Sequence, residues 1–175
     1  MDDTDTFEPF RLPDEDSHPA TIAARLMRHP VHQHLGDNDV SFGWLMRMDE
    51  KRKGGKVELG SVHAVKTMAQ GGFKDLFLQL LERMLGHLPE FIVVINHAWW
   101  EQATDEQRRA LVWHELAHVK QALDKWDAPR FDRDGLPVWA IVSHDLEAFR
   151  SELVEFGAWR EDIATFLNAA RTSGA

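Results

Sequence analysis

The stretch His114-Glu115-Leu116-Ala117-His118 places two imidazoles four residues apart, with a carboxylate between them. Residues four apart lie on one face of an α-helix, one turn above the other, so both imidazoles can bind the same metal ion. The carboxylate of Glu115 lies beside them on the helix surface, where it can accept a proton from a metal-activated water. The pattern predicts a zinc site with His114 and His118 as ligands and Glu115 as general base.

A third zinc ligand must come from elsewhere in the chain, because catalytic zinc usually has three protein ligands and one water. The chain has no Cys, so this ligand must be His, Asp or Glu. The best candidate is His144, which follows a loop long enough to let the next helix fold back. Glu147, one turn further on, is the alternative. Asp145 could instead orient a histidine by accepting its second N–H, or cap the helix.

The motif lies within a segment that has the pattern of a long helix. Thr104 and Gln107 match the capping box that starts many helices, and two acidic residues in the first turn favour the same start. We expect this helix to continue to Leu123 or Asp124. Apolar residues cover most of its sides, which favours a partly enclosed site over an ordinary solvent-facing surface.

Other segments predict the elements around that helix. Residues 40–48 and 57–65 are rich in β-prone residues and flank a polar turn with two Gly at 49–56, so we expect a β-hairpin. Apolar residues at helical spacing predict a helix over 75–87. The continuous apolar run at 91–95 suits a strand covered on both faces.

The whole chain of 175 residues therefore predicts an α+β fold, with a small, mostly antiparallel sheet packed on the active-site helix. Residues 1–18 are acidic and poor in apolar side chains, so we expect a disordered acidic tail followed by one domain over 19–175. Residues 125–137 read as a polar loop. A last helix is expected to begin near residue 143 or 144.

Three further histidines, His29, His32 and His34, lie within six positions of one another. Such a cluster could hold a second metal ion. Ordinary polar surface is the simpler interpretation, and it is the one we expect.

Composition restricts the partners of the chain. The formal net charge of −9 argues against broad nucleic-acid binding, which usually needs a basic face. The first residues lack the basic start and apolar stretch of a secretory signal, and no apolar run is long enough to span a bilayer. A cytoplasmic protein fits these features.

Two segments of the sequence match the pattern of a known family: FIVVINHAWWEQATDEQRRALVWHELAHV at 91–119 and LPVWAIVSHDLEAFRSELVEFGAW at 136–159. They closely resemble the putative phage metallopeptidase family, whose members show an apolar strand, a T-x-x-Q-R-x-A-L helix start, HELxH, and a later H-D-x-E-x-F segment followed by Gly-x-Trp. More distantly the chain is similar to SprT-like zinc peptidases. The close resemblance covers roughly half of the chain.

The resemblance implies a zincin-like fold, a phage or prophage origin, and a protein or peptide as substrate. It implies His114, His118 and His144 as zinc ligands and Glu115 as catalytic base. Two features depart from the family pattern. The helix expected over 75–87 looks like an insertion, and the chain has no Tyr to serve as the transition-state donor found in some zincins.

The resulting prediction is a zinc-dependent peptidase. Its first alternative is a catalytically inactive, zinc-stabilised protein-interaction module, which a fourth protein ligand on the metal would favour. A second alternative is a peptidase acting on DNA-bound proteins, and the acidic charge counts against it.

Overall fold

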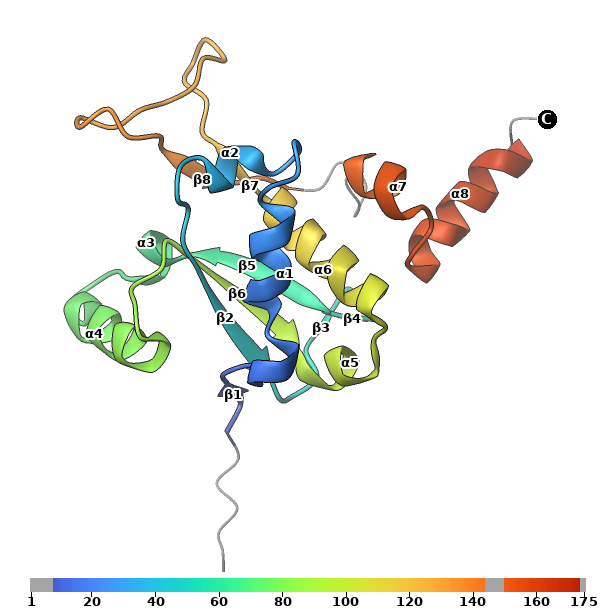
Figure 1. The fold of residues 1–175 in the computed structure, drawn as a ribbon, viewed down its shortest axis with the longest axis horizontal. Helices are drawn as coiled ribbons and strands as arrows, with labels where there is room; N and C mark the ends of the chain where they lie inside the picture. Colours follow the sequence, from blue (N-terminus) through green and yellow to red (C-terminus); the bar gives the residue numbers. More distant parts are fainter. Residues whose placement is uncertain (1–7, 144–149, 174–175) are drawn as a thin grey trace, which may run out of the picture. The chain divides into compact units, whose positions relative to one another are not determined.

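The strand β6 (Phe91–Asn96) is buried at all six positions in the computed structural model. Its β-branched and aromatic residues are typical of a strand covered on both faces, as the sequence predicts. It lies inside a four-stranded sheet of order β1-β2-β6-β5 (Figure 1). β2 (Phe42–Arg47) pairs with β6 in parallel, β5 (Gly60–Ala64) pairs with β6 antiparallel, and β1 (Phe10–Arg11) pairs with β2 antiparallel. The fold is mixed α+β.

The structure describes residues 8–143 and 150–173, and the chain divides into two units. The first contains Met1–Ile22 and Asp39–Ala103, and the second contains Ala23–Asn38 and Thr104–Ala175. Besides the sheet, the first unit contains η1 (Glu15–Ser17), the start of α1 (Pro19–Leu26), β3 (Arg52–Lys53), β4 (Lys56–Val57), α3 (Val65–Met68), α4 (Lys74–Leu85) and α5 (His97–Gln102). The second contains the end of α1, α2 (Gln33–Gly36), α6 (Asp105–Ala117), β7 (Val119–Gln121), β8 (Trp139–Ile141), α7 (Arg150–Phe156) and α8 (Glu161–Ser173).

The expected hairpin between residues 40–48 and 57–65 is wrong, because β6 lies between β2 and β5. β6 is the most continuously apolar strand, and the central position covers it on both sides with hydrogen-bonded neighbours. The polar turn does form, but it joins the short strands β3 and β4. Gly54 and Gly55 have φ values of 57° and 81°, the left-handed pair that a two-residue type I′ turn requires.

The helix expected over 75–87 is confirmed as α4, which packs against the sheet through Leu81. Leu81 shares a buried cluster with Leu45 and Ile92 of β2 and β6. Gly43 of β2 allows the close approach of this helix, since a Cβ there would lie 2.6 Å from Cδ1 of Leu85. α4 ends at Gly86, whose φ of 76° provides the usual left-handed C-cap.

The N-terminal segment contributes an edge strand to the sheet. Phe10 and Arg11 form β1, and a guanidinium nitrogen of Arg11 donates to Nε2 of His97 over 2.6 Å. Arg47 of β2 lies over the Phe10 ring, with its Cζ 4.8 Å from the ring centroid. Residues 10–11 of the expected tail are therefore part of the sheet, whereas residues 1–7 lie outside the described part of the chain.

The helix expected from Thr104 starts where the sequence predicts but ends earlier. Both hydrogen bonds of the capping box between Thr104 and Gln107 are present. The helix stops at Ala117 instead of Leu123 or Asp124, and β7 follows it directly. Pairing with β8 satisfies the backbone of Val119–Gln121 and overrides the helical pattern of the sequence.

Candidate metal centre

α6 and the residue that caps it carry both histidines of the motif. All residues from Ala110 to Ala117 are buried, so this helix is enclosed on every side along its second half. His118 is the C-cap residue but keeps helical backbone angles, with φ −67° and ψ −22°. The spacing of four residues therefore still stacks the two imidazoles, and their ring centroids lie 5.1 Å apart.

His118 is held by the backbone of Val142, which directly follows β8. Its Nδ1 lies 2.7 Å from the carbonyl oxygen of Val142, and the N–H of Val142 donates to the carbonyl of His118 over 2.8 Å. A carbonyl oxygen only accepts, so the ring proton of His118 is on Nδ1. Nε2 then carries the lone pair, which is the form in which imidazole binds a metal.

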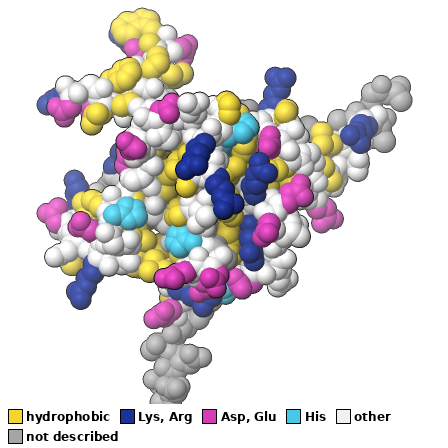
Figure 2. Space-filling model, viewed as in Figure 1, with side chains coloured by type: hydrophobic (Ala, Val, Ile, Leu, Met, Phe, Trp, Pro, Cys, Tyr) yellow, Lys and Arg dark blue, Asp and Glu magenta, His cyan; other side chains and the backbone are white. Residues whose placement is uncertain are grey.

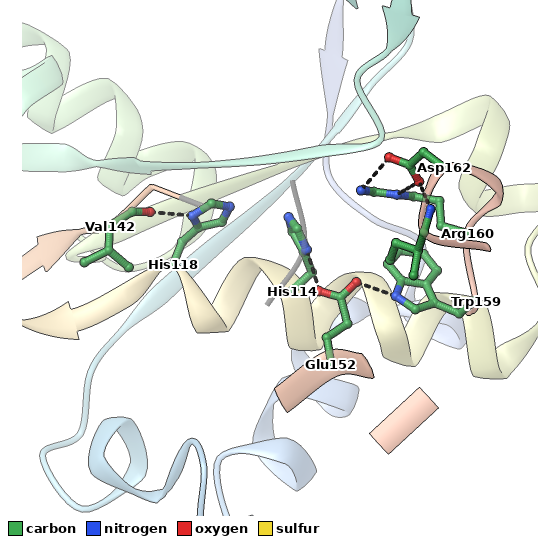
Figure 3. Close-up of polar contacts among 8 residues, drawn as sticks. His114, His118, Val142, Glu152, Trp159, Arg160 and Asp162 are labelled. Carbon is green, nitrogen blue, oxygen red and sulfur yellow. Dashed lines mark hydrogen bonds and ion pairs between the residues drawn. The ribbon is translucent and has the colours of Figure 1, made fainter. Parts of the chain in front are cut away.

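His114 is held in the same way by a side chain that the motif does not contain. Its Nδ1 lies 2.8 Å from Oε2 of Glu152 on α7, and the other oxygen of Glu152 accepts the indole N–H of Trp159 (Figure 3). Glu152 is completely buried. A buried carboxylate between two N–H donors is well satisfied, and it leaves Nε2 of His114 as the metal-binding nitrogen.

The two histidines are therefore held by the same kind of hydrogen bond. In each, Nδ1 donates to an oxygen acceptor from another element, which fixes both the tautomer and the ring orientation. Figure 3 shows both rings on one side of α6, with Val142 beyond His118 and Glu152 beyond His114. These residues fit a zinc ion, which binds neutral imidazole nitrogen at about 2.0–2.1 Å.

Glu115 lies between the two histidines in sequence and is buried, with 2% of its surface exposed. Its neighbours along the helix, Ala110 to Ala117, are mostly apolar. A carboxylate in such surroundings is poorly hydrated, which strengthens its interaction with any nearby proton donor.

The candidates for the third ligand, His144 and Glu147, lie outside the described residues, as does Asp145. Within 8–143 and 150–173 no group of three or more His, Asp or Glu side chains is arranged to hold a metal ion. The described part of the candidate site thus contains two imidazoles in the tautomer that can bind a metal through Nε2, and the carboxylate of Glu115, which follows the first of them.

Glu152 is the site residue that sequence reasoning missed. The sequence pattern of the last helix, expected to begin near residue 143 or 144, places Leu146, Phe149, Leu153 and Phe156 on one face. Residues 144–149 of this expected helix lie outside the described part of the chain. Glu152 stands one turn before Phe156 and three residues after Phe149, so it interrupts that apolar face. A carboxylate on the inward face of a helix needs a buried partner, and that signal could have singled it out.

The histidines near α2 are not the polar surface expected. His32 is fully buried and lies edge-on to Trp113, with ring centroids 4.4 Å apart. Burial, with smaller effects from Lys120, His34 and His29, lowers the pKa of His32 to about 3. His34 is half-buried and its Nε2 lies 3.3 Å from the carbonyl oxygen of Val119. His32 is thus a neutral core residue beside α6.

Comparison with known families gives one result. The family model described as "Putative phage metallopeptidase" matches residues 15–171. The chain therefore belongs to this family, and the resemblance found in the sequence is confirmed. The family description implies a metal cofactor. No curated protein and no solved structure matches the chain.

Within residues 8–143 and 150–173, each helix is too short or too polar to cross a membrane.

Proposed function

We propose that this chain is a zinc-dependent peptidase with a zincin-like fold, formed by residues 19–175 together with the edge strand β1, and acting on protein or peptide substrates. The observation that carries the proposal is that His114 and His118 are oriented by equivalent hydrogen bonds. Each ring donates from Nδ1 to an oxygen acceptor on another element, and each directs its metal-binding nitrogen to the same side of α6. Histidines that bind no metal do not require both rings to be oriented in this way. Zinc-binding histidines, in contrast, almost always donate their second ring N–H to such an acceptor.

His144 is the proposed third ligand, with Glu147 as the alternative. Val142 is anchored to His118 by two hydrogen bonds, one between the two backbones and one from the His118 ring to the Val142 carbonyl. His144 follows Val142 by two residues, a span of at most about 7 Å. Glu152 is anchored to His114 at the other end of the same connection. The segment between these anchors thus starts and ends beside the two motif histidines.

The chemistry follows from the residues around the ion. Bound zinc supplies a Lewis acid for the scissile carbonyl and lowers the pKa of a water towards about 7. Glu115 would take a proton from the attacking water and return it to the leaving amine. Glu152 and Val142 hold the two imidazoles so that this geometry needs no rearrangement during the reaction.

A direct test combines metal content with cleavage. Protein purified from zinc-replete medium should contain about one zinc per chain and should cleave an unfolded polypeptide, and a chelator should abolish the cleavage. Restoring zinc should restore it. Protein that is metal-free under these conditions would refute the proposal.

The same test separates the enzyme from the inactive zinc-stabilised module. Such a module would contain zinc and unfold at lower temperature without it, but it would show no cleavage that depends on zinc. A phage origin and a cytoplasmic location agree with the family and with the sequence composition, and they remain part of the proposal.

A further inference from the structure

The segment between the strands β7 and β8 forms a defined fork rather than a loop. Three backbone hydrogen bonds close its base: the N–H of Ala122 donates to Val138, that of Arg130 to Ala122, and that of Val138 to Arg130, over 2.7–2.9 Å. The chain leaves this junction twice, as a first lobe over 123–129 and a second lobe over 131–137. Figure 1 shows both lobes projecting from the ends of β7 and β8.

The two lobes repeat one another in sequence and in hydrogen bonding. Leu123-Asp-Lys-Trp-Asp-Ala-Pro and Phe131-Asp-Arg-Asp-Gly-Leu-Pro share an apolar residue, an Asp, a basic residue and a final Pro at the same positions. In the first lobe, Oδ1 of Asp124 accepts the N–H groups of residues 126 and 128 over 2.8 and 3.0 Å. In the second, Oδ1 of Asp132 accepts those of residues 134 and 136, both over 2.9 Å.

Further features of the lobes match. The first and last residues of each lobe form an isolated bridge, Leu123 with Pro129 and Phe131 with Pro137. Asp127 and Gly135, at equivalent positions, have positive φ values of 61° and 79°. Each lobe is therefore an ordered turn whose Asp side chain satisfies the backbone.

This order holds apolar side chains out in the solvent. Each lobe exposes two: Leu123 and Trp126 in the first, at 55% and 73% of their surface, and Phe131 and Leu136 in the second, at 54% and 62%. Figure 2 shows hydrophobic side chains gathered on this projection. Exposed apolar residues that cluster on a well-ordered element mark a binding surface.

The fork is continuous with the metal centre within the same unit. β7 starts at the residue after His118, and β8 ends at the residue before Val142, whose backbone holds His118. The junction lies four residues beyond His118, about 13 Å along a strand. A polypeptide extended over about four residues spans the same length.

The charges of the fork identify the kind of occupant. Its two lobes carry four Asp, with Lys125 and Arg133 as their basic residues, so the surface does not favour a phosphate backbone or an acidic membrane. Resting on the proposed peptidase function, we propose that the fork binds an extended apolar segment of an unfolded polypeptide substrate and holds it beside the zinc site. The substrate class is therefore polypeptide with exposed apolar side chains.

Binding is measured first in the zinc-loaded Glu115→Gln variant, which should cleave roughly 10²-fold more slowly than the wild type or slower still. The probe is fluorescein-labelled, reduced and carboxymethylated lactalbumin, a permanently unfolded chain, and the readout is fluorescence anisotropy. Adding Trp126→Ala and Phe131→Ala together should weaken binding at least tenfold. The control is Phe73→Ala, which removes an aromatic with 79% of its surface exposed from the start of α4. It should leave binding unchanged.

Cleavage by the otherwise wild-type protein gives an independent readout. The double fork variant should raise KM for the unfolded chain about tenfold. It should leave kcat/KM for a blocked dipeptide amide unchanged, because a dipeptide spans at most about 7 Å and cannot reach from the site to the fork junction. Unchanged binding in the double variant, or an equal loss in Phe73→Ala, would overturn the inference. Flotation with phosphatidylcholine vesicles that depends on the fork would replace it with a membrane anchor. Zinc content is measured on every sample. A metal-free chain that still binds the probe through the fork would refute the proposed peptidase function but not polypeptide binding by the fork.

Discussion

The carboxylate of Glu152 accepts a hydrogen bond from Nδ1 of His114 at 2.8 Å, joining α7 to the motif helix across 38 positions of the sequence. Glu152 has no exposed surface, and its second oxygen is occupied by the indole N–H of Trp159. Under the proposed function, Glu152 fixes the tautomer and the angle of His114, a proposed zinc ligand, and so acts as a positioning residue.

Removing this acceptor should weaken zinc binding. In Glu152→Ala the Nδ1 proton of His114 loses its partner in a buried site, and we expect zinc affinity to fall by roughly 10- to 100-fold. The measurement is competition with a chromophoric chelator. The control is Glu155→Ala on the same helix, which breaks a more exposed ion pair with Arg109 at 3.0 Å and should change zinc affinity little. Equal affinities in wild type and Glu152→Ala would show that Glu152 is only a packing residue.

The element types were predictable where one pattern dominates locally. β6 is a continuous apolar run, α4 has apolar residues at helical spacing, and the start of α6 has a capping box, and each lies where the sequence places it. These signals depend on neighbouring residues alone, so one sequence is enough to detect them.

Which strands pair and where the helix α6 ends were not predictable, because both depend on contacts between distant segments. β2 and β5 each pair with β6 rather than with each other, and no local pattern reports which strand takes the central place. α6 ends at Ala117 because β7 pairs with β8, about twenty residues later. The segment expected to be helical as far as Leu123 or Asp124 in fact passes from a helix into a strand and then into the fork.

Some residues of the candidate site were likewise predictable from local sequence patterns, and others were not. His114, Glu115 and His118 follow from the spacing of the motif. Glu152 is 34 positions beyond His118 and carries only a weak signal, a carboxylate on the apolar face of α7. The fork was read as a polar loop because its composition is polar, although the repeated Asp and Pro positions of its two lobes are visible in the sequence.

The identity of the third ligand is decided by metal content. We expect His144→Ala to lower zinc affinity by at least 100-fold, since removing one of three protein ligands leaves the ion held by two. Glu147→Ala should retain zinc, and it serves as the matched control because Glu147 is the alternative ligand, three positions further along the sequence. His118→Ala should lose zinc in the same way as His144→Ala. Zinc loss in Glu147→Ala with retention in His144→Ala would reverse the assignment.

Acid should destabilise the metal-free protein through His32. The pKa of this histidine is lowered to about 3 in the folded protein, against 6.5 as its ordinary value, so the unfolded chain binds more protons between these limits. Stability is therefore lost as the pH falls from about 6.5 towards 3, on the order of 2 kcal/mol from this group at pH 5. The measurement is the difference in Tm between pH 7.5 and pH 5.0, with a chelator present.

His32→Phe keeps an aromatic ring beside Trp113 and cannot be protonated, so its Tm should fall less on acidification than that of the wild type. The control His87→Ala removes an exposed histidine and should keep the wild-type pH dependence. An identical loss in Tm for wild type and His32→Phe would show that other groups cause the acid sensitivity. His34 and His63, whose pKa values burial also lowers, would then be the groups to test.

Glu115→Gln separates catalysis from architecture. Glu115 follows the first proposed ligand directly, yet its carboxylate is not needed to hold the ion, and Gln keeps its shape while removing the basic oxygen. Zinc content and Tm should therefore match the wild type. Turnover of an unfolded polypeptide should fall by roughly 10²-fold or more, because proton transfer to and from the reacting groups is lost. The substrate should still bind, so the variant should form a stable complex with it that the wild type cleaves. If Glu115→Gln instead cleaved at the wild-type rate with its zinc in place, Glu115 would not be the base, and proton transfer would have to be assigned to another group near His114 and His118.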